Sequence, residues 1–374
     1  PTRAMDISAN AKIRSRSVIS VDPALAMVDV MNLVAKALAH QGPALNFTDE
    51  ATDSVDSDIC LIVGTTGSTG TRKSVALSSA ALLASARASL DYLQARPGQT
   101  WALHLPVHHI AGINVLIRAL ELGTTPMDLR DAVDYPKSDF SAVVPTQIYR
   151  ALNGDNKLLT HLQSAAKVLV GGAPLHDDLL HQASSAGISV VRTYGMSETS
   201  GGCIYEGSPL KETRVRISDA GLIEISGPIL ASSYLNNEAL WSEQYRDGWF
   251  RTSDRGEITA DGIVRVLGRT DDVYITGGEK VSLTQIDEIL HASFPDHQWC
   301  AVAVADEQWG QRLAVAVSGT NHPSIEDVSN VLHGALGEIA KAKQLLVFEE
   351  LPLIGIGKID RAQIIDRAQK EFNV

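Results

Sequence analysis

The chain of 374 residues is long enough for two domains, and its hydrophobic content of 44% suffices for a sizeable core. A formal net charge of −12 argues against nucleic-acid binding, which depends on clustered Lys and Arg side chains that neutralise phosphates. Cys60, Cys203 and Cys300 are too few and too scattered for a disulfide framework or a zinc site. The sequence shows no secretory signal and no long uncharged apolar run, so a cytoplasmic location without membrane insertion is predicted.

Before the first chemical motif, the sequence predicts one helix over residues 23–39 and an acidic loop over residues 49–58. The apolar, β-branched segment 59–63 then predicts a buried strand. A second helix is predicted after Ser78 and Ser79, which can cap it. The apolar side chains on one face of this helix would be Leu82, Leu83, Ala86, Leu90 and Leu93.

Between that strand and that helix lies a loop, residues 64–74, of glycines, small hydroxyl residues and a lysine. Glycines let the backbone approach an anion, while N–H groups, hydroxyls and lysine act as donors. The loop does not match a Walker A motif, because Arg72 stands before Lys73 and the glycines are spaced differently. A flexible linker is the alternative, although the apolar segments on both sides would fix its ends. We therefore predict a phosphate site made by Thr65, Thr66, Gly67, Ser68, Thr69, Gly70 and Lys73.

The next segment, residues 101–106, predicts a strand ended by proline, and a helix follows it through Leu122. His104, His108 and His109 lie in this stretch and allow a metal site as one interpretation. However, adjacent histidines point in different directions, and no acidic or sulfur partner is spaced to complete such a site. A half-buried histidine with satisfied hydrogen bonds is a further alternative for His109.

Arg118 stands in the otherwise apolar helical segment 114–120, which is expected to pack inward. A guanidinium in that position must be paired, or it must be available to an anionic ligand. The alternative to a ligand-binding role is an arginine that is paired internally or that extends its charged end to solvent.

From residue 140 to residue 193, short apolar strands alternate with helices. This β-α-β order is typical of a parallel sheet with helices on its faces, in which ligands bind beyond the carboxyl ends of the strands. Gly171, Gly172 and Ala173 follow one such strand end, and Thr193, Tyr194 and Gly195 lie at the next. We therefore expect these residues to border a ligand site.

The remaining sequence predicts an antiparallel β lobe over residues 206–266, with a hairpin turn at Asp261-Gly262. A compact α+β unit is predicted after Asp271, with a capping box at Ser282 and Gln285. The predicted fold is an α/β large N-terminal domain, residues 1–270, joined by a hinge to a small α+β C-terminal domain, residues 271–374. The large domain would contain parallel sheets with helices on their faces and the small β lobe.

In chain order, these motifs resemble those of the AMP-forming acyl-CoA synthetase, adenylation-domain and luciferase superfamily. The resemblance covers residues 59–361, although Arg72 and Ser74 depart from the phosphate-loop pattern and Ser253 replaces a usual glycine. The motifs are the loop 65–74, the segment 106–112, Gly171-Gly172-Ala173, residues 193–199, residues 247–254, Gly268-Arg269-Thr270-Asp271-Asp272 and residues 351–361. Within the superfamily, the sequence is most similar to the short o-succinylbenzoate–CoA ligases of menaquinone biosynthesis.

The resemblance implies roles for single residues. Ser197 would join the phosphate-binding loop, and Glu198 would supply a carboxylate oxygen to Mg²⁺. Adenine and ribose would be bound by Gly171, Gly172, Ala173, Thr193, Tyr194, Gly195, Asp254 and Arg269. The carboxylate substrate would contact His109, Arg118, Ser200 and Gly201. The catalytic residues would be Lys358, Glu198 and His109. The hinge and the coenzyme A path would be formed by Asp271, Gly277, Gly278 and Lys280.

The implied reaction consumes ATP with Mg²⁺, forms an acyl-adenylate from o-succinylbenzoate, and transfers the acyl group to coenzyme A. A homodimer is a further expectation from the resemblance. Another aryl- or acyl-CoA ligase would share the nucleotide motifs and differ near His109 and Arg118. A catalytically silent nucleotide-binding regulator is the second alternative, and the presence of both Glu198 and Lys358 argues against it. Without the other motifs, Lys358 would be interpreted as an ordinary surface lysine.

Overall fold

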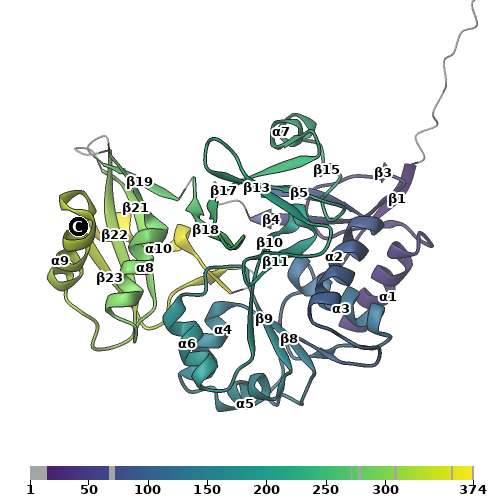
Figure 1. Cartoon of the computed structure of the whole chain (residues 1–374), viewed down its shortest axis with the longest axis horizontal. Coiled ribbons are helices and arrows are strands. Elements are labelled where there is room, and N and C mark those ends of the chain that lie inside the picture. The colour runs from purple at the N-terminus through teal and green to yellow at the C-terminus, as the bar shows by residue number, and fades with distance from the viewer. Residues whose placement is uncertain are drawn as a thin grey trace, which may run out of the picture.

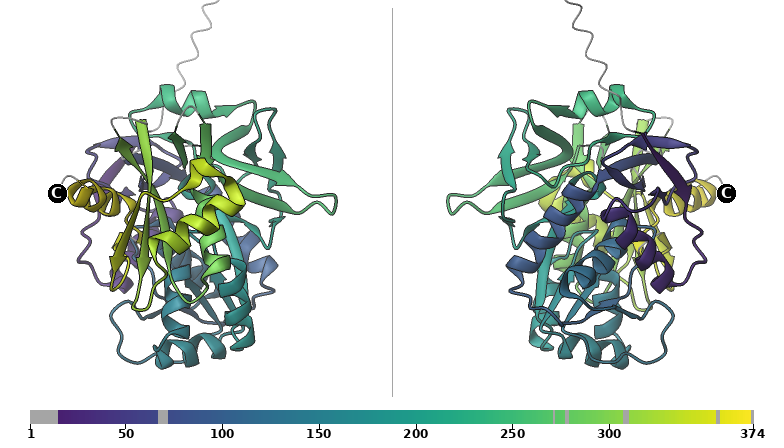
Figure 2. Two further views of the ribbon diagram at one scale, coloured as in Figure 1. Left: turned by 90° about the vertical axis from the view of Figure 1, so that its left-hand side faces the viewer. Right: turned by 90° about the vertical axis from the view of Figure 1, so that its right-hand side faces the viewer.

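The computed structural model describes residues 15–66, 72–270, 272–276, 279–306, 310–354 and 357–372. We call residues 15–270 the N-terminal part and residues 272–372 the C-terminal part. Figure 1 shows the two parts side by side, with the C-terminal part on the left. Figure 2 shows them from two further directions. Within the described residues, no helix is both long enough and apolar enough to cross a membrane.

The first sheet of the N-terminal part has the strand order β15-β5-β4-β2-β1-β3 within the described residues. Its strands are β1 Ser15–Ser20, β2 Ala44–Asn46, β3 Ser54–Asp56, β4 Ile59–Thr66, β5 Arg72–Ser78 and β15 Ser233–Tyr234. Helix α1, Met27–Leu38, is the one predicted before residue 59, but the strands around it were not predicted. They are short, and the polar residues of β1 and β3 hide any regular alternation of apolar side chains.

The predicted order of strand, loop and helix around the phosphate loop is wrong. Strand β5 pairs antiparallel with β4, with Thr65 opposite Lys73, so the loop joins two strands of a hairpin. Val75 and Leu77 are fully buried in β5, and burial of this short apolar run favours a strand before the helix. Helix α2, Ser79–Tyr92, begins after the hairpin, and Ser78 caps it by accepting a hydrogen bond from the backbone of Ala81, as predicted.

The second sheet has the order β12-β11-β10-β9-β8-β6-β7 within the described chain. Its parallel strands are β6 Trp101–Leu103, β7 Met127–Asp128, β8 Phe140–Val143, β9 Lys167–Val170 and β10 Val190–Met196. Strands β11 Gly201–Tyr205 and β12 Ser208–Pro209 add an antiparallel edge, and the short 3₁₀ helix Ser197–Thr199 precedes β11. The associated helices are α3 Ile110–Leu122, α4 Pro145–Leu152, α5 Asn156–Ser164 and α6 Asp177–Ser185. The predicted β-α-β order is confirmed.

Alternate side chains of this sheet enter two different cores. Phe140 and Leu169 belong to the large apolar cluster that also contains α1, α2 and α3. Val143 and Val168 belong to a separate cluster with α4, α5 and α6. Because successive side chains of a strand point to opposite faces, helices cover both faces of the sheet (Figure 1). The carboxyl ends of its strands are thereby left for ligands.

The predicted antiparallel lobe over residues 206–266 is confirmed in part, because β12 and β15 within that range join the other two sheets. Its strands are β13 Arg214–Ile217, β14 Leu222–Ser226, β16 Tyr245–Arg246, β17 Trp249–Ile258 and β18 Val264–Arg269, and helix α7 covers Glu238–Gln244. Strands β17 and β18 are antiparallel and are joined through the predicted turn at Asp261-Gly262, where Gly262 has φ = 81°. A left-handed φ of this kind suits glycine, which explains the turn.

The C-terminal part is built around β21 Trp299–Asp306, β22 Gly310–Ser318 and β23 Gln344–Phe348. Two small hairpins flank them: β19 Val273–Thr276 with β20 Glu279–Ser282, and β24 Leu353–Ile354 with β25 Lys358–Ile359. The helices are α8 Leu283–Ser293, α9 Ile325–Leu336 and α10 Arg361–Phe372, with a 3₁₀ turn at Glu338–Ala340. Its buried apolar clusters contain residues from 274 onward and none from the N-terminal part.

Candidate active site

The predicted ribose corner combines Tyr194 of β10, Asp254 of β17 and Arg269 of β18. The Tyr194 hydroxyl donates to Asp254 Oδ2 at 2.6 Å, and Arg269 Nη1 lies 3.3 Å from Asp254 Oδ1. Burial raises the pKa of Tyr194 well above its usual range, and the Asp254 charge raises it further, so the phenol stays a donor. The Asp254 carboxylate is therefore held in one orientation, and it is buried with only 6% of the residue exposed.

The predicted adenine segment lies at the carboxyl end of β9. A Cβ atom on Gly171 would lie 2.3 Å from Thr193 Oγ1, which is too close for any side chain. The Thr193 hydroxyl donates to the Val170 carbonyl at 3.2 Å. Gly171 is therefore required by close packing of the ends of β9 and β10, with Gly172 and Ala173 following it.

Glu198 lies in the 3₁₀ helix after β10 and is buried, with 7% exposed. Its Oε1 accepts a hydrogen bond of 2.8 Å from the hydroxyl of Tyr234. No Lys, Arg or His nitrogen of the described residues lies within 4.0 Å of its carboxylate. A buried carboxylate without a cationic partner is costly unless a cation joins it.

The described residues contain no group of three or more His, Cys, Asp or Glu side chains that could hold a metal ion. Mg²⁺ commonly takes only one or two carboxylates from the protein and its other ligands from nucleotide phosphates and water. The donor set around Glu198 therefore fits the predicted metal. The alternative of a metal site at His104, His108 and His109 finds no support in the described residues.

The phosphate hairpin contributes Lys73, whose Nζ lies 5.1 Å from the centre of the Tyr234 ring. Thr65 is opposite Lys73 in the ladder. The predicted residues Gly67, Ser68, Thr69 and Gly70 lie outside the described residues, as does the side chain of Thr66. Ser197 is buried beside Glu198.

The wall of the predicted carboxylate pocket is formed by the start of α3 and the start of β11. His109 immediately precedes α3, and burial lowers its pKa to about 4, with smaller effects from His108 and Lys358. The imidazole is therefore neutral near pH 7. Asn114 Nδ2 donates to the Ser200 carbonyl at 2.8 Å, and a Cβ on Gly201 would lie 2.1 Å from that nitrogen. Glycine at 201 is thus required by the approach of Asn114.

Arg118 lies about 13 Å further along α3 than His109. Its guanidinium is buried with 4% of the residue exposed; Nη2 donates to the Tyr205 hydroxyl at 3.3 Å, and the Trp101 ring lies 5.0 Å from Cζ. Nε has no hydrogen-bond partner among the described groups. Within the described chain, no carboxylate lies within 4.0 Å of this guanidinium. These contacts satisfy only some of the hydrogen-bond donors of the Arg118 guanidinium, and none of them neutralises its charge.

Lys358 reaches this region from the other end of the chain, in β25 (yellow in Figure 1). Burial lowers its pKa, repulsion from Arg269 lowers it further, and Asp254 opposes both effects. Lys358 also contributes to the lowered pKa of His109. The lysine is therefore close to the ribose corner and to the carboxylate pocket at once.

Hydrogen bonds and a ring contact join the C-terminal part to residues at α4 and α6 of the N-terminal part. The Thr146 hydroxyl of α4 donates to the Gly357 carbonyl at 3.0 Å. His176, next to α6, and His291 of α8 have ring centres 4.0 Å apart. The predicted hinge and coenzyme A residues Asp271, Gly277 and Gly278 lie outside the described residues, as does the side chain of Lys280 in β20.

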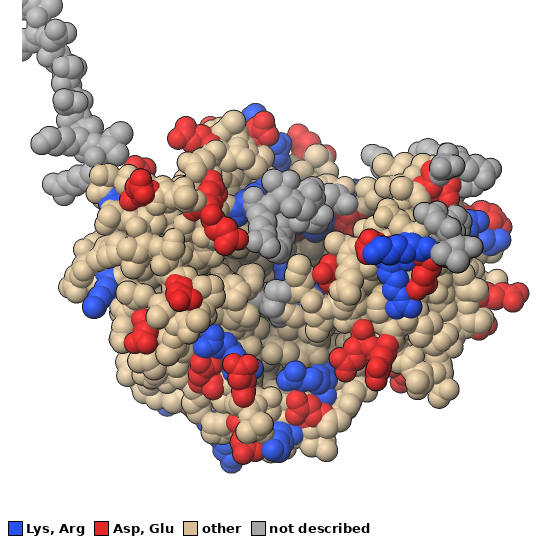
Figure 3. All heavy atoms as spheres, turned by 180° about the vertical axis from the view of Figure 1, so that it is seen from behind, with Lys and Arg blue, Asp and Glu red and all other residues tan. Residues whose placement is uncertain are grey.

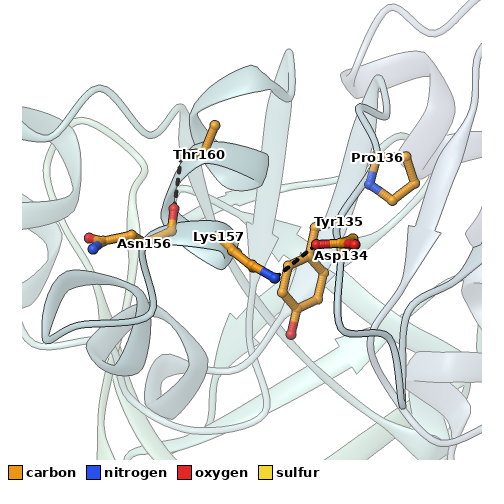
Figure 4. Close-up of a pocket in the computed structure, with 6 residues that line it drawn as sticks. All are labelled: Asp134, Tyr135, Pro136, Asn156, Lys157 and Thr160. Atoms are coloured by element: carbon orange, nitrogen blue, oxygen red, sulfur yellow. Dashed lines mark hydrogen bonds and ion pairs between the residues drawn. The ribbon is translucent and has the colours of Figure 1, made fainter.

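A hollow lined by Asp134, Tyr135, Pro136, Asn156, Lys157 and Thr160 is shown in Figure 4. Lys157 donates to Asp134 there at 2.8 Å, so its charge has a partner, and none of these residues was predicted as functional. On the face seen in Figure 3, acidic and basic side chains are intermixed, which does not resemble a nucleic-acid surface.

Comparison with protein families adds independent evidence. The model of the family described as AMP-binding enzyme matches residues 5–229. The chain belongs to this family. The predicted membership of the AMP-forming adenylating enzymes is thus confirmed.

Relatives and solved structures agree with that membership. A protein of Mycobacterium tuberculosis named "Probable 2-succinylbenzoate–CoA ligase" is 38% identical over 335 residues, which cover 84% of this chain and 86% of the relative. The 2-succinylbenzoate–CoA ligase of Listeria innocua is 27% identical over 85% of this chain and 74% of its own. The structure of o-succinylbenzoate CoA synthetase from Bacillus subtilis matches with a TM-score of 0.71 at 20% identity, covering 93% of this chain and 82% of that one. ATP-bound MatB from Rhodopseudomonas palustris matches with a TM-score of 0.75 at 20% identity, covering 94% of this chain and 84% of its own. At such identities the structures show the fold.

Sequence reasoning missed three residues that contact the predicted site. Tyr234 touches Glu198, Asn114 touches Ser200, and Thr146 touches Gly357. Tyr234 and Thr146 are far in sequence from the residues they contact, so spacing could not have found them. Asn114 carried a weak signal, because it is a polar residue in an apolar helix.

Proposed function

We propose that the chain is an AMP-forming acid–CoA ligase that acts on o-succinylbenzoate. The observation that carries this proposal is that Lys358 interacts electrostatically with Asp254 and Arg269 of the ribose corner and also with His109. A half-buried lysine that interacts with both the ribose corner and His109 is suited to the joining of two anions. The names of the relatives support the choice of acid.

In the first half-reaction, a carboxylate oxygen of the acid attacks the α-phosphorus of ATP, the bond to the β-phosphate oxygen breaks, and pyrophosphate leaves. Two anions approach each other, so the site must supply positive charge and alignment rather than a general base. Lys358 and Lys73 supply charge, and Asp254 with Arg269 orients the ribose. Mg²⁺ held by Glu198 would neutralise phosphate charge when bound.

In the second half-reaction, the thiolate of coenzyme A attacks the carbonyl carbon of the acyl-adenylate, and AMP leaves with the bonding electrons. We propose that residues 1–270 and 271–374 are domains that rotate about Asp271, which withdraws Lys358. Gly277, Gly278 and Lys280 would then border the pantetheine path. Among the described residues, the apolar clusters of each part contain no residue of the other, which supports such a rotation.

The second carboxylate of o-succinylbenzoate is assigned to Arg118. A buried guanidinium with an unpartnered Nε and no carboxylate nearby among the described residues is suited to an anion, directly or through water. His109, Ser200 and Gly201 would border the carboxylate that becomes activated. Tyr205 and Trp101 are the internal partners that compete with this assignment.

The test is pyrophosphate release from ATP over a panel of carboxylic acids, with and without coenzyme A. We expect release with o-succinylbenzoate and formation of its thioester when coenzyme A is added. Preference for another acid would identify a different ligase of the family, and release with none would identify a silent nucleotide binder. The cytoplasmic location and the homodimer stay predictions.

A further inference from the structure

Tyr234 contacts two groups of the nucleotide site at once. Its hydroxyl donates to Glu198 Oε1 at 2.8 Å, and its ring lies 5.1 Å from the ammonium of Lys73. The phenol thus lies between the proposed metal ligand and the lysine of the phosphate hairpin. Tyr234 is 36 residues from Glu198 in sequence and belongs to a different sheet.

The fold fixes this tyrosine firmly. Strand β15 is the edge of the first sheet, and Tyr234 is opposite Val75 in β5, the strand that begins at the phosphate loop. The side chain is buried, and Trp241 packs against it edge-on with ring centres 5.3 Å apart. Trp241 in turn stacks on Phe250 of β17. The hydroxyl is therefore held by a packed aromatic group and not by a mobile loop.

The hydrogen bond constrains Glu198 in a defined way. Burial raises the pKa of Tyr234, and the charge of Glu198 raises it further, so the phenol keeps its proton and donates. Besides Glu198, Gln244 Oε1 lies 2.6 Å from the hydroxyl and competes for that proton. No described residue donates to Glu198 Oε2, so one carboxylate oxygen is engaged by the protein and the other is left for a ligand.

We propose that Tyr234 is a positioning residue for the metal ligand: it orients the Glu198 carboxylate so that the unengaged oxygen meets Mg²⁺, beside the Lys73 ammonium. The inference rests on the proposed function, because it takes Glu198 as the ligand of the Mg²⁺ that accompanies ATP. Tyr234 itself touches neither metal nor substrate in this role. The role extends the site beyond the sequence motifs, to an edge strand that pairs with the phosphate hairpin.

The experiment compares ATP binding in Mg²⁺ and in EDTA by isothermal titration calorimetry, with no acid substrate present. Wild type, Tyr234→Phe, Glu198→Gln and the double variant are measured. Tyr234→Phe removes the hydroxyl and keeps the ring, so the contacts with Lys73 and Trp241 remain. In this variant, we expect the Mg²⁺-dependent gain in ATP affinity to be about tenfold smaller than in the wild type, since a hydrogen bond to a charged group is lost. Affinity for ATP in EDTA should stay within about twofold.

The double variant decides whether Tyr234 acts through Glu198. In the Glu198→Gln background, Tyr234→Phe should change the Mg²⁺-dependent gain by less than about twofold, because coupled residues are not additive. Tyr274→Phe is the matched control: it removes another buried tyrosine hydroxyl, which donates to the Ile339 carbonyl at 2.9 Å in the C-terminal part. It should leave the gain unchanged.

The possible outcomes separate this inference from the proposed function. Additive losses in the double variant, an unchanged gain in Tyr234→Phe, or an equal loss in Tyr274→Phe would each overturn the positioning role. A wild type whose ATP affinity does not depend on Mg²⁺ would overturn the proposed metal chemistry itself. Thermal unfolding of each variant shows whether it is folded, and Tyr234→Trp, which keeps an aromatic ring and changes the donor, gives a second variant expected to lose the gain.

Discussion

The two halves of the candidate site are built in different ways. In the N-terminal part, functional side chains are held by buried partners: Asp254 by Tyr194, and Glu198 by Tyr234. The C-terminal part contributes Lys358, and the Thr146 hydroxyl of the N-terminal part donates to the carbonyl of the preceding residue, Gly357. Under the proposed domain rotation, the first half is preformed and the second is delivered.

The difference has an electrostatic side. Burial disfavours the charged form of Lys358, and the like charge of Arg269 adds to this, whereas Asp254 partly offsets both effects. The net cost of inserting Lys358 should therefore fall when an anion binds. A triphosphate or a carboxylate between the two cations would remove this cost, so ligand binding and domain docking should be coupled.

Lys358→Ala should produce the largest effect, because it removes the delivered charge and leaves the preformed half intact. One charge donor at a transition state is worth about 10²–10³ in rate, so adenylation should fall by that factor. Thioester formation from a preformed acyl-adenylate should be spared. Pyrophosphate release and thioester formation are measured separately, with the exposed Lys343→Ala as control. Equal losses in both half-reactions would contradict the delivered-lysine interpretation.

Arg118→Leu should act within the preformed half and depend on the substrate. Loss of a charge-assisted hydrogen bond should lower kcat/KM for o-succinylbenzoate by about 10- to 100-fold. A benzoate analogue without the second carboxylate should be little affected, because it has nothing to pair with the guanidinium. Parallel losses on both compounds would show that Arg118 is structural, held by Tyr205 and Trp101, and the acid would revert to an unspecified aryl or acyl acid.

The preformed half was also the more predictable one. Motifs at strand ends, such as Tyr194 and Glu198, could be placed because parallel strands bring their carboxyl ends to one edge. Distant pairings could not be predicted: nothing in the sequence shows that β15 pairs with β5, which is what places Tyr234 against Glu198. The same limit explains the error at β5, whose strand character depends on its pairing with β4.

The delivered half was predictable as chemistry and not as geometry. The sequence marks Lys358 through its motif, but Thr146 and His176 are ordinary residues whose role depends on docking between segments far apart in the chain. Arg118 shows a third case. An arginine in an apolar helix predicts either an internal partner or a ligand, and the structure provides internal contacts without neutralising the charge.

The pair His176–His291 should make docking of the delivered half sensitive to pH. Burial lowers the pKa of His291 to about 3, and His176 lowers it further; burial also lowers the pKa of His176, against the opposing charges of Asp177 and Asp178. The pKa of a free histidine is about 6.5, so the undocked form binds more protons than the docked form. Docking is therefore strongest above that pH and weakens as pH falls toward the docked pKa.

His291 alone should change the docking equilibrium by about tenfold between about pH 7.5 and about pH 5.5, and His176 should add to this change. Energy transfer between probes on the two parts measures it directly. The variant with His176→Gln and His291→Gln should lose most of this pH dependence. His104 and His161 form another buried pair inside the N-terminal part, with their Nε2 atoms 3.2 Å apart. This pair is present in the wild type and in the variant, so it serves as an internal control. A variant with an unchanged pH profile would exclude the pair as the titrating group.

Thr146→Val should give the smallest effect, and it separates delivery from chemistry. It removes the hydroxyl that donates to the Gly357 carbonyl at 3.0 Å and keeps the shape of the side chain. A neutral hydrogen bond contributes about 1 kcal/mol, so adenylation should fall by about fivefold. Thioester formation from acyl-adenylate should be unaffected, because Lys358 is then withdrawn. Thr146→Ser keeps the hydroxyl and should restore the rate. If Thr146→Ser is as slow as Thr146→Val, the lysine is positioned by packing of the Thr146 methyl group near Gly357 and not by the hydrogen bond.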